Sequence, residues 1–424
     1  MAKGAFWSLA GALISRGLGL ISSIIVARML GKVGFGELGI IQNTVGMLGT
    51  FAGFGMGLTA TKYIAEFKIK DPAKAGRVMS LSGLVAIITG GIISIALVIF
   101  APWLAKNTLA APHLSRYLQI SAVFLFLSAL NGSQTGALAG FEAFKTIAQV
   151  NLWAGITAFP LMVGGVYISG LEGAIWGLLA SMGINWLLNH IALRIEARKA
   201  NIPFSYYGCM QEWKVVWTFS FPSVLAGAMV GPVNWACSAM LVNQPNGYAE
   251  MGIFNAANQW FVILLYLPGI MAQTVLPILS ERLGENDIIR SGKILSLSIR
   301  INFYMIIPIV ILCCILSSSI MRLYGDSFKS GGLTLIVILL TAGILSIQTP
   351  VGTIISASDK MWMGFVMNLG WGIAFIGFTW ILLELGSLGL SMARGFAYIL
   401  HASWTFGFAY YYLSMSVKER KYSI

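Results

Sequence analysis

Charged residues are scarce in this chain. Only 10% of its 424 residues are Asp, Glu, Lys or Arg, against ~25% in an average soluble domain, while 57% are hydrophobic. A soluble fold of this length needs charged side chains to cover its surface, so the composition excludes a soluble enzyme, a disordered chain and a fibrous protein. An outer-membrane barrel is excluded as well, because barrel strands alternate polar and apolar residues over ~10 positions, whereas the apolar runs here are continuous.

Residues typical of metal, disulfide and catalytic sites are also few. The four cysteines show no C-x-x-C or Cys/His ligand spacing, and we expect them to be buried as small apolar residues. The motifs G-x-x-x-x-G-K-[ST], G-x-S-x-G and H-E-x-x-H are missing. No carboxylate lies inside an apolar run, and the acids at the edges of the runs are Glu37, Glu66, Glu142 and Glu384. The sequence therefore predicts a protein that is not an enzyme and uses no cofactor or metal.

Twelve apolar segments are long enough to cross a membrane, which takes ~20 apolar residues in a helix. They are residues 6–29, 37–61, 78–103, 117–140, 147–169, 173–194, 215–242, 252–279, 295–321, 333–356, 361–385 and 390–414. The longest polar stretch, Arg194 to Lys214, divides the chain nearly in half. We therefore predict an all-α integral membrane protein of about twelve transmembrane helices in two six-helix bundles, residues 1–200 and 201–424.

The distribution of Lys and Arg predicts the orientation of these helices. With the N-terminus in the cytoplasm, 19 of the 27 Lys and Arg residues fall on the cytoplasmic side, 7 fall on the other side, and Arg16 lies inside the first segment. Both termini are then cytoplasmic, and the first apolar run, too long for a cleaved signal peptide, stays as a helix. The net charge of +12 reflects basic loops beside anionic lipid, so no nucleic-acid partner is expected. The charged segments Asp71–Arg77 and Glu281–Lys293 are expected to be solvated loops.

A short internal repeat supports the division into halves. Glu37-Leu38-Gly39-Ile40 opens the second apolar segment, and Glu250-Met251-Gly252-Ile253 opens the eighth, 213 residues later. Both segments would follow an outer loop and run inward, so the halves would be six-helix repeats of the same orientation. Transporters built from such repeats place their substrate between the halves.

Arg16 is the first candidate for a binding residue, because it is the only basic residue well inside a predicted helix. A charge in the bilayer centre costs at least ~2.5 kcal/mol on insertion scales and usually faces a wet interior. The alternative is an arginine that reaches back to the cytoplasmic headgroups, since Arg16 lies about ten residues in from that end.

The eighth segment carries a stripe of polar residues. At ~100° per residue they share one face along the segment: Asn255, Asn258, Gln259, Tyr266 and Gln273. Pro268 should kink this helix. The stripe either lines a water-filled pathway or forms hydrogen bonds that hold helices together. Amides and aromatic rings of this kind would suit a neutral sugar.

Weaker polar groups lie in three other segments. In the seventh segment Pro222 and Pro232 interrupt a similar face, formed by Ser223, Gly227, Asn234 and Ser238. In the second, Gln42 and Asn43 are cavity candidates, although the glycines that follow Gln42 on its face are typical of close helix packing. The sixth contains Asn185, Asn189 and His190, and the twelfth contains His401; a single histidine in an apolar helix is more often a packed, hydrogen-bonded group than a proton carrier.

Short motifs along nearly the whole chain resemble those of the polysaccharide transport family, the Wzx-type oligosaccharide flippases. In the first half they are Ala27-Arg28-Met29-Leu30-Gly31 with Phe35-Gly36, Gly53-Phe54-Gly55-Met56-Gly57, and Tyr63-Ile64-Ala65-Glu66. In the second half they are Gly252-Ile253-Phe254-Asn255-Ala256-Ala257, Pro277-Ile278-Leu279-Ser280, and Tyr324-Gly325-Asp326-Ser327-Phe328. Each motif is short, but their order and spacing together are fairly specific.

The resemblance implies a member of the multidrug/oligosaccharidyl-lipid/polysaccharide exporter superfamily, with two bundles around a central cavity. It implies alternating-access transfer of an undecaprenyl-pyrophosphate-linked oligosaccharide, commonly an O-antigen unit of lipopolysaccharide, from the cytoplasmic to the periplasmic leaflet of a bacterial inner membrane. Arg16 is the position that fits the family's cationic contact with the pyrophosphate. Membrane lipids, and a polysaccharide polymerase with its chain-length machinery, would be the partners. The alternatives are a cation-coupled multidrug exporter of the same superfamily, which should carry an intramembrane acid, and a membrane-embedded polymerase or ligase, which should carry a long periplasmic loop.

Overall fold

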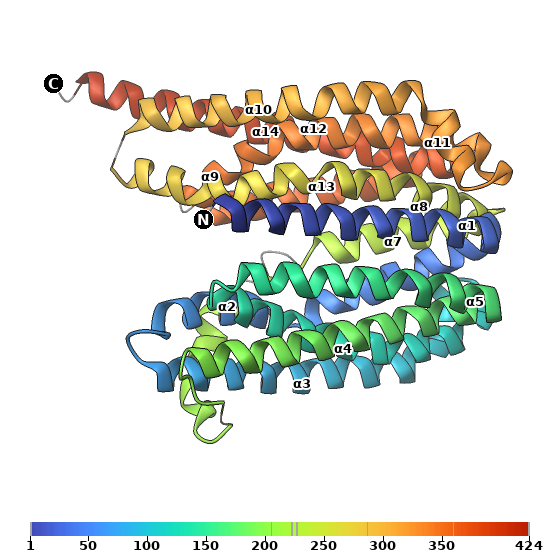
Figure 1. The fold of residues 1–424 in the computed structure, drawn as a ribbon. Helices are drawn as coiled ribbons and strands as arrows, with labels where there is room; N and C mark the ends of the chain where they lie inside the picture. Colours follow the sequence, from blue (N-terminus) through green and yellow to red (C-terminus); the bar gives the residue numbers. More distant parts are fainter. Residues whose placement is uncertain are drawn as a thin grey trace. The chain divides into compact units, whose positions relative to one another are not determined.

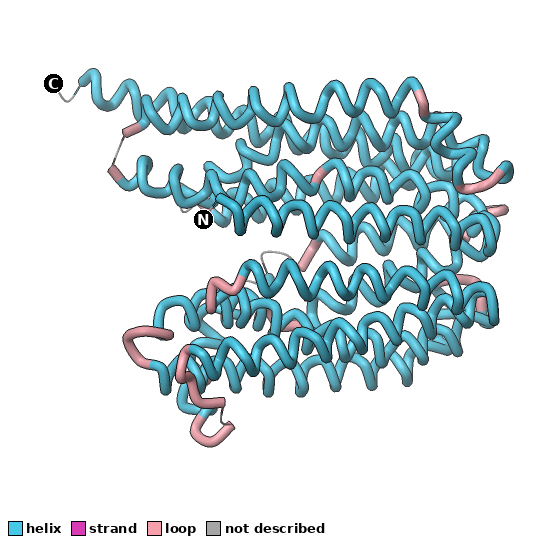
Figure 2. Tube along the Cα trace, viewed as in Figure 1, coloured by secondary structure: helices cyan, strands magenta, loops and turns pink. Residues whose placement is uncertain are grey.

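The computed structural model describes residues 2–204, 206–221, 224–225, 228–285, 287–358 and 360–422, and within them helix is the only regular structure (Figure 2). Eight helical stretches in this part of the chain are long and apolar enough to cross a membrane. Three of these stretches, Ile14–Ala52, Phe144–Lys199 and Trp362–Leu413, each contain two of the predicted segments, and the shorter apolar helix Val230–Val242 completes the set of twelve. The prediction of an all-α membrane protein is confirmed.

Contacts divide the chain into two compact units, Met1–Trp235 and Ala236–Ile424. The helices of the first unit are α1 (Ala2–Ala52), α2 (Met56–Phe67), α3 (Pro72–Trp103), α4 (Ser115–Gly140) and α5 (Phe144–Lys199), with short turns at Leu104–Thr108 and Pro112–Leu114. A linker with the short helices η3 (Cys209–Glu212) and η4 (Val216–Ser220) leads to α7 (Val230–Val242), in which the division between the units falls. The boundary between the two six-helix bundles at residues 200 and 201 stays a prediction.

The second unit continues with eight further elements. They are α8 (Gly247–Leu264), α9 (Tyr266–Gly284), α10 (Ile288–Ile315), α11 (Ser317–Leu323), η5 (Asp326–Gly331), α12 (Gly332–Ala357), α13 (Met361–Leu382) and, after a short turn at Leu383–Leu385, α14 (Gly386–Tyr422). In the first unit, α1 breaks at Gly31 and α5 at Ser169–Gly170, and at each break the chain turns back (Figure 1). These two breaks explain why one continuous helical stretch holds two predicted segments.

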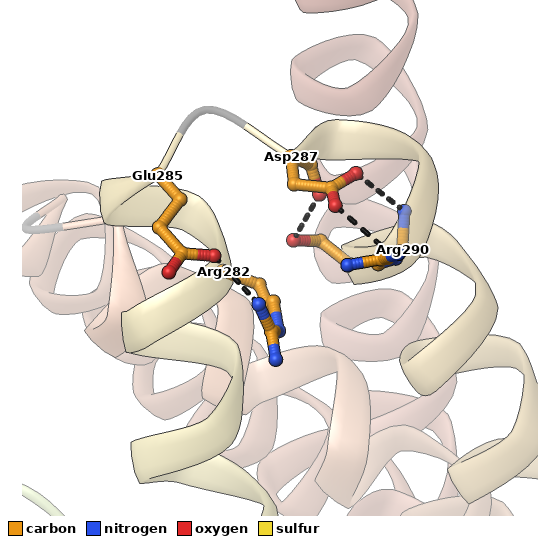
Figure 3. Close-up of polar contacts among 5 residues, drawn as sticks. Arg282, Glu285, Asp287 and Arg290 are labelled. Atoms are coloured by element: carbon orange, nitrogen blue, oxygen red, sulfur yellow. Dashed lines mark hydrogen bonds and ion pairs between the residues drawn. The ribbon is translucent and has the colours of Figure 1, made fainter.

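The two charged segments predicted as loops are mostly helical, which corrects that expectation. α3 begins at Pro72 and α10 at Ile288, so only a few residues at each place are non-helical. The reason is an aspartate cap: Asp71 accepts a hydrogen bond from the backbone N–H of Lys74 at 2.9 Å, and Asp287 accepts one from that of Arg290 at 3.1 Å. Figure 3 shows Asp287 at the start of α10, where its carboxylate also approaches the Arg290 guanidinium at 3.4 Å.

The repeat proposed from sequence is present in the backbone of both units. The two capping aspartates are 216 residues apart, and so are Gly170 and Gly386, which begin the last helix of each half with nearly the same dihedrals, φ 55° and ψ −129° against φ 60° and ψ −133°. Both glycines occupy a region of φ that other residues rarely adopt. Equivalent turns at equivalent distances along the chain are what a duplicated six-helix unit predicts.

The second helix of each half is broken at the same relative place. α1 ends at Ala52 and the chain resumes as α2 at Met56, while α8 ends at Leu264 and α9 starts at Tyr266. In the second case Pro268 has no N–H to give to the carbonyl of Leu264, so the kink expected from this proline is confirmed.

A glutamine–histidine pair is also repeated. In the first unit the side-chain amide of Gln134 on α4 lies 3.3 Å from Nδ1 of His190 on α5, and in the second unit Gln348 on α12 contacts Nδ1 of His401 on α14. Each histidine thus joins the fourth and sixth helices of its own half. The expectation that these histidines are packed, hydrogen-bonded groups agrees with these contacts.

Candidate functional site

The most unusual polar residue of the second unit is Arg394, one of the seven basic residues that the charge distribution assigns to the non-cytoplasmic side, only four residues into the predicted segment 390–414. α14 begins at Gly386, so Arg394 lies eight residues, or ~12 Å, inside a membrane-spanning helix. Its side chain is buried, with 8% of the residue exposed. The interpretation of Arg16 as the only basic residue well inside a span was therefore wrong, because the predicted start of the last segment at residue 390 was four residues too late.

Arg394 is held by neutral groups. Its Nη1 donates a hydrogen bond of 2.7 Å to Oδ1 of Asn258 on α8, and its guanidinium carbon lies 3.8 Å from the ring centroid of Phe261, one turn further along the same helix. The buried Nε has no hydrogen-bond partner. In the described part of the chain no carboxylate comes within ion-pair distance of it. Arg394 is thus a positive charge fixed in a transmembrane interior without a negative partner beside it.

Two acids that open membrane-spanning helices are engaged at the ends of those helices. Glu250, in the first turn of α8, accepts hydrogen bonds from the backbone N–H and the hydroxyl of Ser387 at 2.8 and 2.6 Å. Its counterpart in the first unit, Glu37, lies 2.7 Å from Nε2 of His113. The ion pairs of the described residues also lie toward helix ends, as the pair between Arg282 and Glu285 illustrates (Figure 3). Among the residues that the structure describes, no acid forms an ion pair with Arg394.

The five residues of the predicted polar stripe do not share one environment. Asn258 uses its amide oxygen to hold Arg394, which is the helix-joining role. Asn255, Gln259 and Tyr266 are half-buried, and Gln273 is exposed. Val262, which shares their helical face, is 47% exposed, whereas Leu264 on the opposite side is 5% exposed. Four of the five stripe residues therefore lie on a face of α8 and α9 that their own unit leaves partly open.

The candidates around the first unit lie in several environments. Arg16 and Gln42 on α1 are exposed, Asn43 is half-buried, and Asn234 on α7 is half-buried and donates to the backbone carbonyl of Val230 at 2.7 Å. Ser238, in the part of α7 assigned to the second unit, is buried. Ser223 and Gly227, together with Pro222, lie outside the described residues.

One polar contact between α1 and α7 was not predicted from the sequence. The indole N–H of Trp235 donates to Oγ1 of the fully buried Thr44 at 2.9 Å, and Thr44 in turn donates to the carbonyl of Ile40. Trp235 follows Asn234, and Thr44 follows Asn43, so this bond fixes the part of each helix that carries a candidate. The signal available in the sequence was the tryptophan beside an asparagine in an apolar run.

Asn189, one of the weaker candidates, is the centre of a packed cluster. Its amide nitrogen donates to Oδ1 of Asn131 at 2.8 Å and to Oδ1 of Asn185 at 3.0 Å, and it is 2% exposed. The cluster joins α4 to α5, which is a packing role. For a metal, no group of three or more His, Cys, Asp or Glu side chains gathers anywhere among the residues the structure describes. Cys209, Cys237 and Cys313 are buried and Cys314 half-buried, as expected for small apolar residues.

The open face of α8 and α9 leads to a first prediction. In a variant without the native cysteines, single cysteines at Asn255, Gln259 and Gln273 should react with a small hydrophilic thiol reagent in membranes, because that face would be wet. A cysteine at Leu264, which is buried, is the matched control and should react at least tenfold more slowly. Uniform reactivity at all four positions, or protection at all of them, would contradict the water-filled pathway. The whole stripe would then be interpreted as hydrogen bonds that join helices.

Comparison with known proteins gives consistent results. Residues 1–282 match the model of a family described as polysaccharide biosynthesis protein. EPS I polysaccharide export inner membrane protein EpsE of Ralstonia nicotianae is 21% identical over 399 residues, which cover 92% of this chain and 90% of that protein. A solved multidrug resistance MATE family transporter of the MOP superfamily, in an inward-facing conformation, matches with a TM-score of 0.85 at 15% identity, covering 98% of this chain and 99% of its own.

A second solved structure shares the fold at greater distance. It is a MOP superfamily transporter from Pyrococcus furiosus, described as having a binding pocket of reverse polarity, and it matches with a TM-score of 0.72 at 15% identity, covering 98% of this chain and 96% of its own. At such identities the likeness establishes the MATE-like fold and not the cargo. The polarity of the chain's own interior must therefore be considered to identify the cargo.

Proposed function

This chain belongs to the family of polysaccharide biosynthesis proteins, and from that premise we propose that it is a flippase for an undecaprenyl-pyrophosphate-linked oligosaccharide, an O-antigen or similar repeat unit. It would carry this lipid from the cytoplasmic to the periplasmic leaflet of the bacterial inner membrane, with both of its own termini in the cytoplasm. In coarser terms the chain is a polysaccharide-export transporter of the MOP superfamily. Its relatives are transporters, which is consistent with a chain that is not an enzyme.

The observation that carries the proposal is the sign of the charge inside the spans. Arg394 is buried in α14 with neutral partners, and the acids of the described residues lie toward the ends of helices. In a medium of low effective dielectric constant a fixed positive charge attracts anions and repels cations over ~10 Å. A pyrophosphate group fits this potential, whereas a cationic drug or a coupling cation does not.

The other candidate residues would each bind a different part of the substrate. Arg16, exposed on α1, would meet the pyrophosphate directly as a second positive group. The amides of Asn255, Gln259 and Gln273 would hydrogen-bond sugar hydroxyls, and Tyr266 would offer a flat face to a sugar ring. The polyprenyl chain would remain in the bilayer, so only the polar head group would need a wet path, opened alternately to each side. Gln42, Asn43, Asn234 and Ser238 remain weaker candidates.

The two alternatives are less consistent with these residues. A cation-coupled multidrug exporter needs an acid inside the spans, and none was found there among the described residues. A polymerase or ligase needs an extended outer loop with catalytic groups, but the longest predicted outer loop, near Lys106 to Arg116, is about a dozen residues and is largely helical. A polymerase and its chain-length machinery would instead be separate proteins that use the exported unit.

Purified protein in liposomes provides the test. The substrate is an undecaprenyl-pyrophosphate-linked disaccharide with a fluorescent label on the sugar, and dithionite added outside bleaches only the label in the outer leaflet. We expect bleaching to reach the inner-leaflet label in proteoliposomes but not in protein-free vesicles. The same label on undecaprenol without phosphate, and the cationic dye ethidium under a proton or sodium gradient, are the controls. Movement of ethidium with no movement of the lipid-linked disaccharide would overturn the proposal in favour of a multidrug exporter.

A further inference from the structure

The linker after α5 exposes a row of large aromatic and apolar side chains. They follow one another at intervals of one, three, three and four residues, and the exposed fractions are high: 49% for Tyr206, 95% for Tyr207, 57% for Met210, 40% for Trp213 and 57% for Trp217. Lys214 is exposed between the two tryptophans. Five such side chains in water would be an unusual loss of hydrophobic free energy for so short a segment. We refer to these six residues as the linker face.

The opposite side of the linker is fixed to the first unit. Cys209 and Val216 are 2% exposed and pack against Met56, Leu81 and Val85 of α2 and α3. The guanidinium of Arg77 donates to Oε1 of Glu212 from Nε at 3.0 Å and from Nη2 at 2.9 Å.

The backbone is held just as closely at the start of the linker. A Cβ added to Gly76, near the start of α3, would collide with the carbonyl oxygen of Pro203. The linker face is therefore presented outward by a held backbone and does not belong to a loose loop.

The linker lies at the end of the unit where basic residues gather. Lys68 pairs with Glu142 at 3.0 Å between the α2–α3 and α4–α5 turns, and Arg194 at the end of α5 stacks on Phe204 of the linker at 4.0 Å. In Figure 1 the linker, in yellow-green, projects sideways beyond α3 at that end of the unit. This is the end that the charge distribution assigns to the cytoplasm, where phospholipid headgroups are anionic.

The linker face is continuous with the lipid-exposed side of α3. A Cβ at Gly83 would lie 3.9 Å from the hydroxyl of Tyr206, and one turn beyond Gly83 the exposed apolar side of α3 begins with Ile87 and Ile88, followed by Ile92 and Ile95. α3 crosses the membrane by length and hydropathy, so these isoleucines meet lipid tails. The linker face therefore lies where a membrane-spanning surface passes into the headgroup layer, the region that Tyr and Trp prefer.

We propose that the linker face is a membrane-surface anchor, whose aromatic side chains insert among the phospholipid headgroups while Lys214 binds anionic lipid phosphates. The ring bodies would bury against the upper acyl chains, and the Tyr hydroxyl and Trp N–H groups would hydrogen-bond to headgroup oxygens. The connection between the two predicted bundles would then be held at the bilayer surface. This inference does not depend on the transported substrate.

Depth-dependent fluorescence quenching tests the anchor directly. In the cysteine-free variant, Tyr207→Cys and Met210→Cys are labelled with an environment-sensitive nitrobenzoxadiazole dye, and the full-length protein is reconstituted into phosphatidylcholine vesicles with or without phosphatidylglycerol. Lys70→Cys, exposed on the α2–α3 turn at the same end, is the matched control. Lipids with a nitroxide on the headgroup or in mid-chain, and aqueous iodide, are the quenchers. Size-exclusion profiles and melting temperatures confirm that each variant is folded.

We expect blue-shifted emission at 207 and 210, with quenching by the headgroup nitroxide at least twice that by the mid-chain nitroxide and little quenching by iodide. The Lys70→Cys label should respond to iodide instead. Adding Lys214→Gln should reduce headgroup quenching in phosphatidylglycerol vesicles and leave it unchanged in pure phosphatidylcholine. Iodide-accessible labels at both 207 and 210 would overturn the anchor. Iodide protection that depends on protein concentration, without quenching from either lipid, would also overturn it and would indicate a second copy of the chain as the partner.

Discussion

Replacing Arg394 with methionine should abolish most polysaccharide export without destabilising the protein. Methionine has a similar length and no charge, and replacement of a buried charged group by an apolar one is often neutral or stabilising. The loss of this charge-assisted bond to Asn258 should cost ~1.5–3 kcal/mol, and the removal of the desolvation cost of the buried guanidinium should offset it. Two unit charges ~10 Å apart interact by ~1.7 kcal/mol at an effective dielectric constant of ~20, and the pyrophosphate carries more than one charge. Since ~1.4 kcal/mol is tenfold, the transport rate should fall by at least ~10-fold.

The measurements are surface polysaccharide in complemented cells, the proteoliposome bleaching rate, and the melting temperature of the purified variant. Arg322→Met, which removes an exposed positive charge from α11 of the same unit, is the matched control and should export normally. Arg394→Lys should retain part of the activity, because it keeps the charge but loses the planar stack on Phe261. Normal export by a folded Arg394→Met protein would show that the charge serves only to join α8 to α14.

A loss of folding in Arg394→Met would also be informative, and Asn258→Leu separates the two roles. This variant removes the hydrogen bond and leaves the charge in place. If Arg394 acts through its charge, Asn258→Leu should destabilise the protein and still transport at a substantial rate once folded. If Arg394 acts only as a structural tie, the two variants should have the same effect on both stability and export.

The sequence predicted the helices of this protein well and the environments of their polar residues less well. The described residues of the twelve apolar segments are mostly helical, since ~20 consecutive apolar residues can be satisfied in a bilayer only by a helix or a closed barrel. The ends were less certain, because polar residues such as Asp71 cap a helix and do not mark where the membrane begins. The same uncertainty of a few residues placed Arg394 only four residues into the predicted segment 390–414, although α14 begins at Gly386.

Which way a polar side chain points could not be obtained from a single helix. The helical angles placed Asn258 beside Asn255, but Asn258 holds Arg394, which is 136 residues away in the chain. Such a partner is chosen by packing between helices, and neither helix alone contains that information. The repeat, by contrast, was visible at Glu37 and Glu250, because a repeat is a pattern along the sequence and does not depend on how helices pack. The pairs Asp71 with Asp287 and Gly170 with Gly386 extend it.

Adding one methyl group at Gly165 should destabilise the protein severely, while the same change at the neighbouring Gly164 should not. Gly165 and Gly173 lie on either side of the turn in α5, and a Cβ on either one would collide with the backbone of the other. Close approach of this kind is possible only for small residues. Because the obstacle is backbone, it cannot rotate away, and the limbs of α5 would have to separate. We expect a cost of about 3 kcal/mol for Gly165→Ala.

Gly164 offers a control in the same turn of the same helix. A Cβ there would meet nothing within 4 Å, so Gly164→Ala should be neutral or should raise the melting temperature, since alanine is favoured over glycine in a helix by up to ~1 kcal/mol. The two substitutions therefore differ in sign, although they add the same group one residue apart. Thermal unfolding of both variants in detergent, followed by the fluorescence of the native tryptophans, measures the difference. Equal melting temperatures would mean that the limbs of α5 do not pack through Gly165 and Gly173, and the turn at Gly170 would then need another explanation.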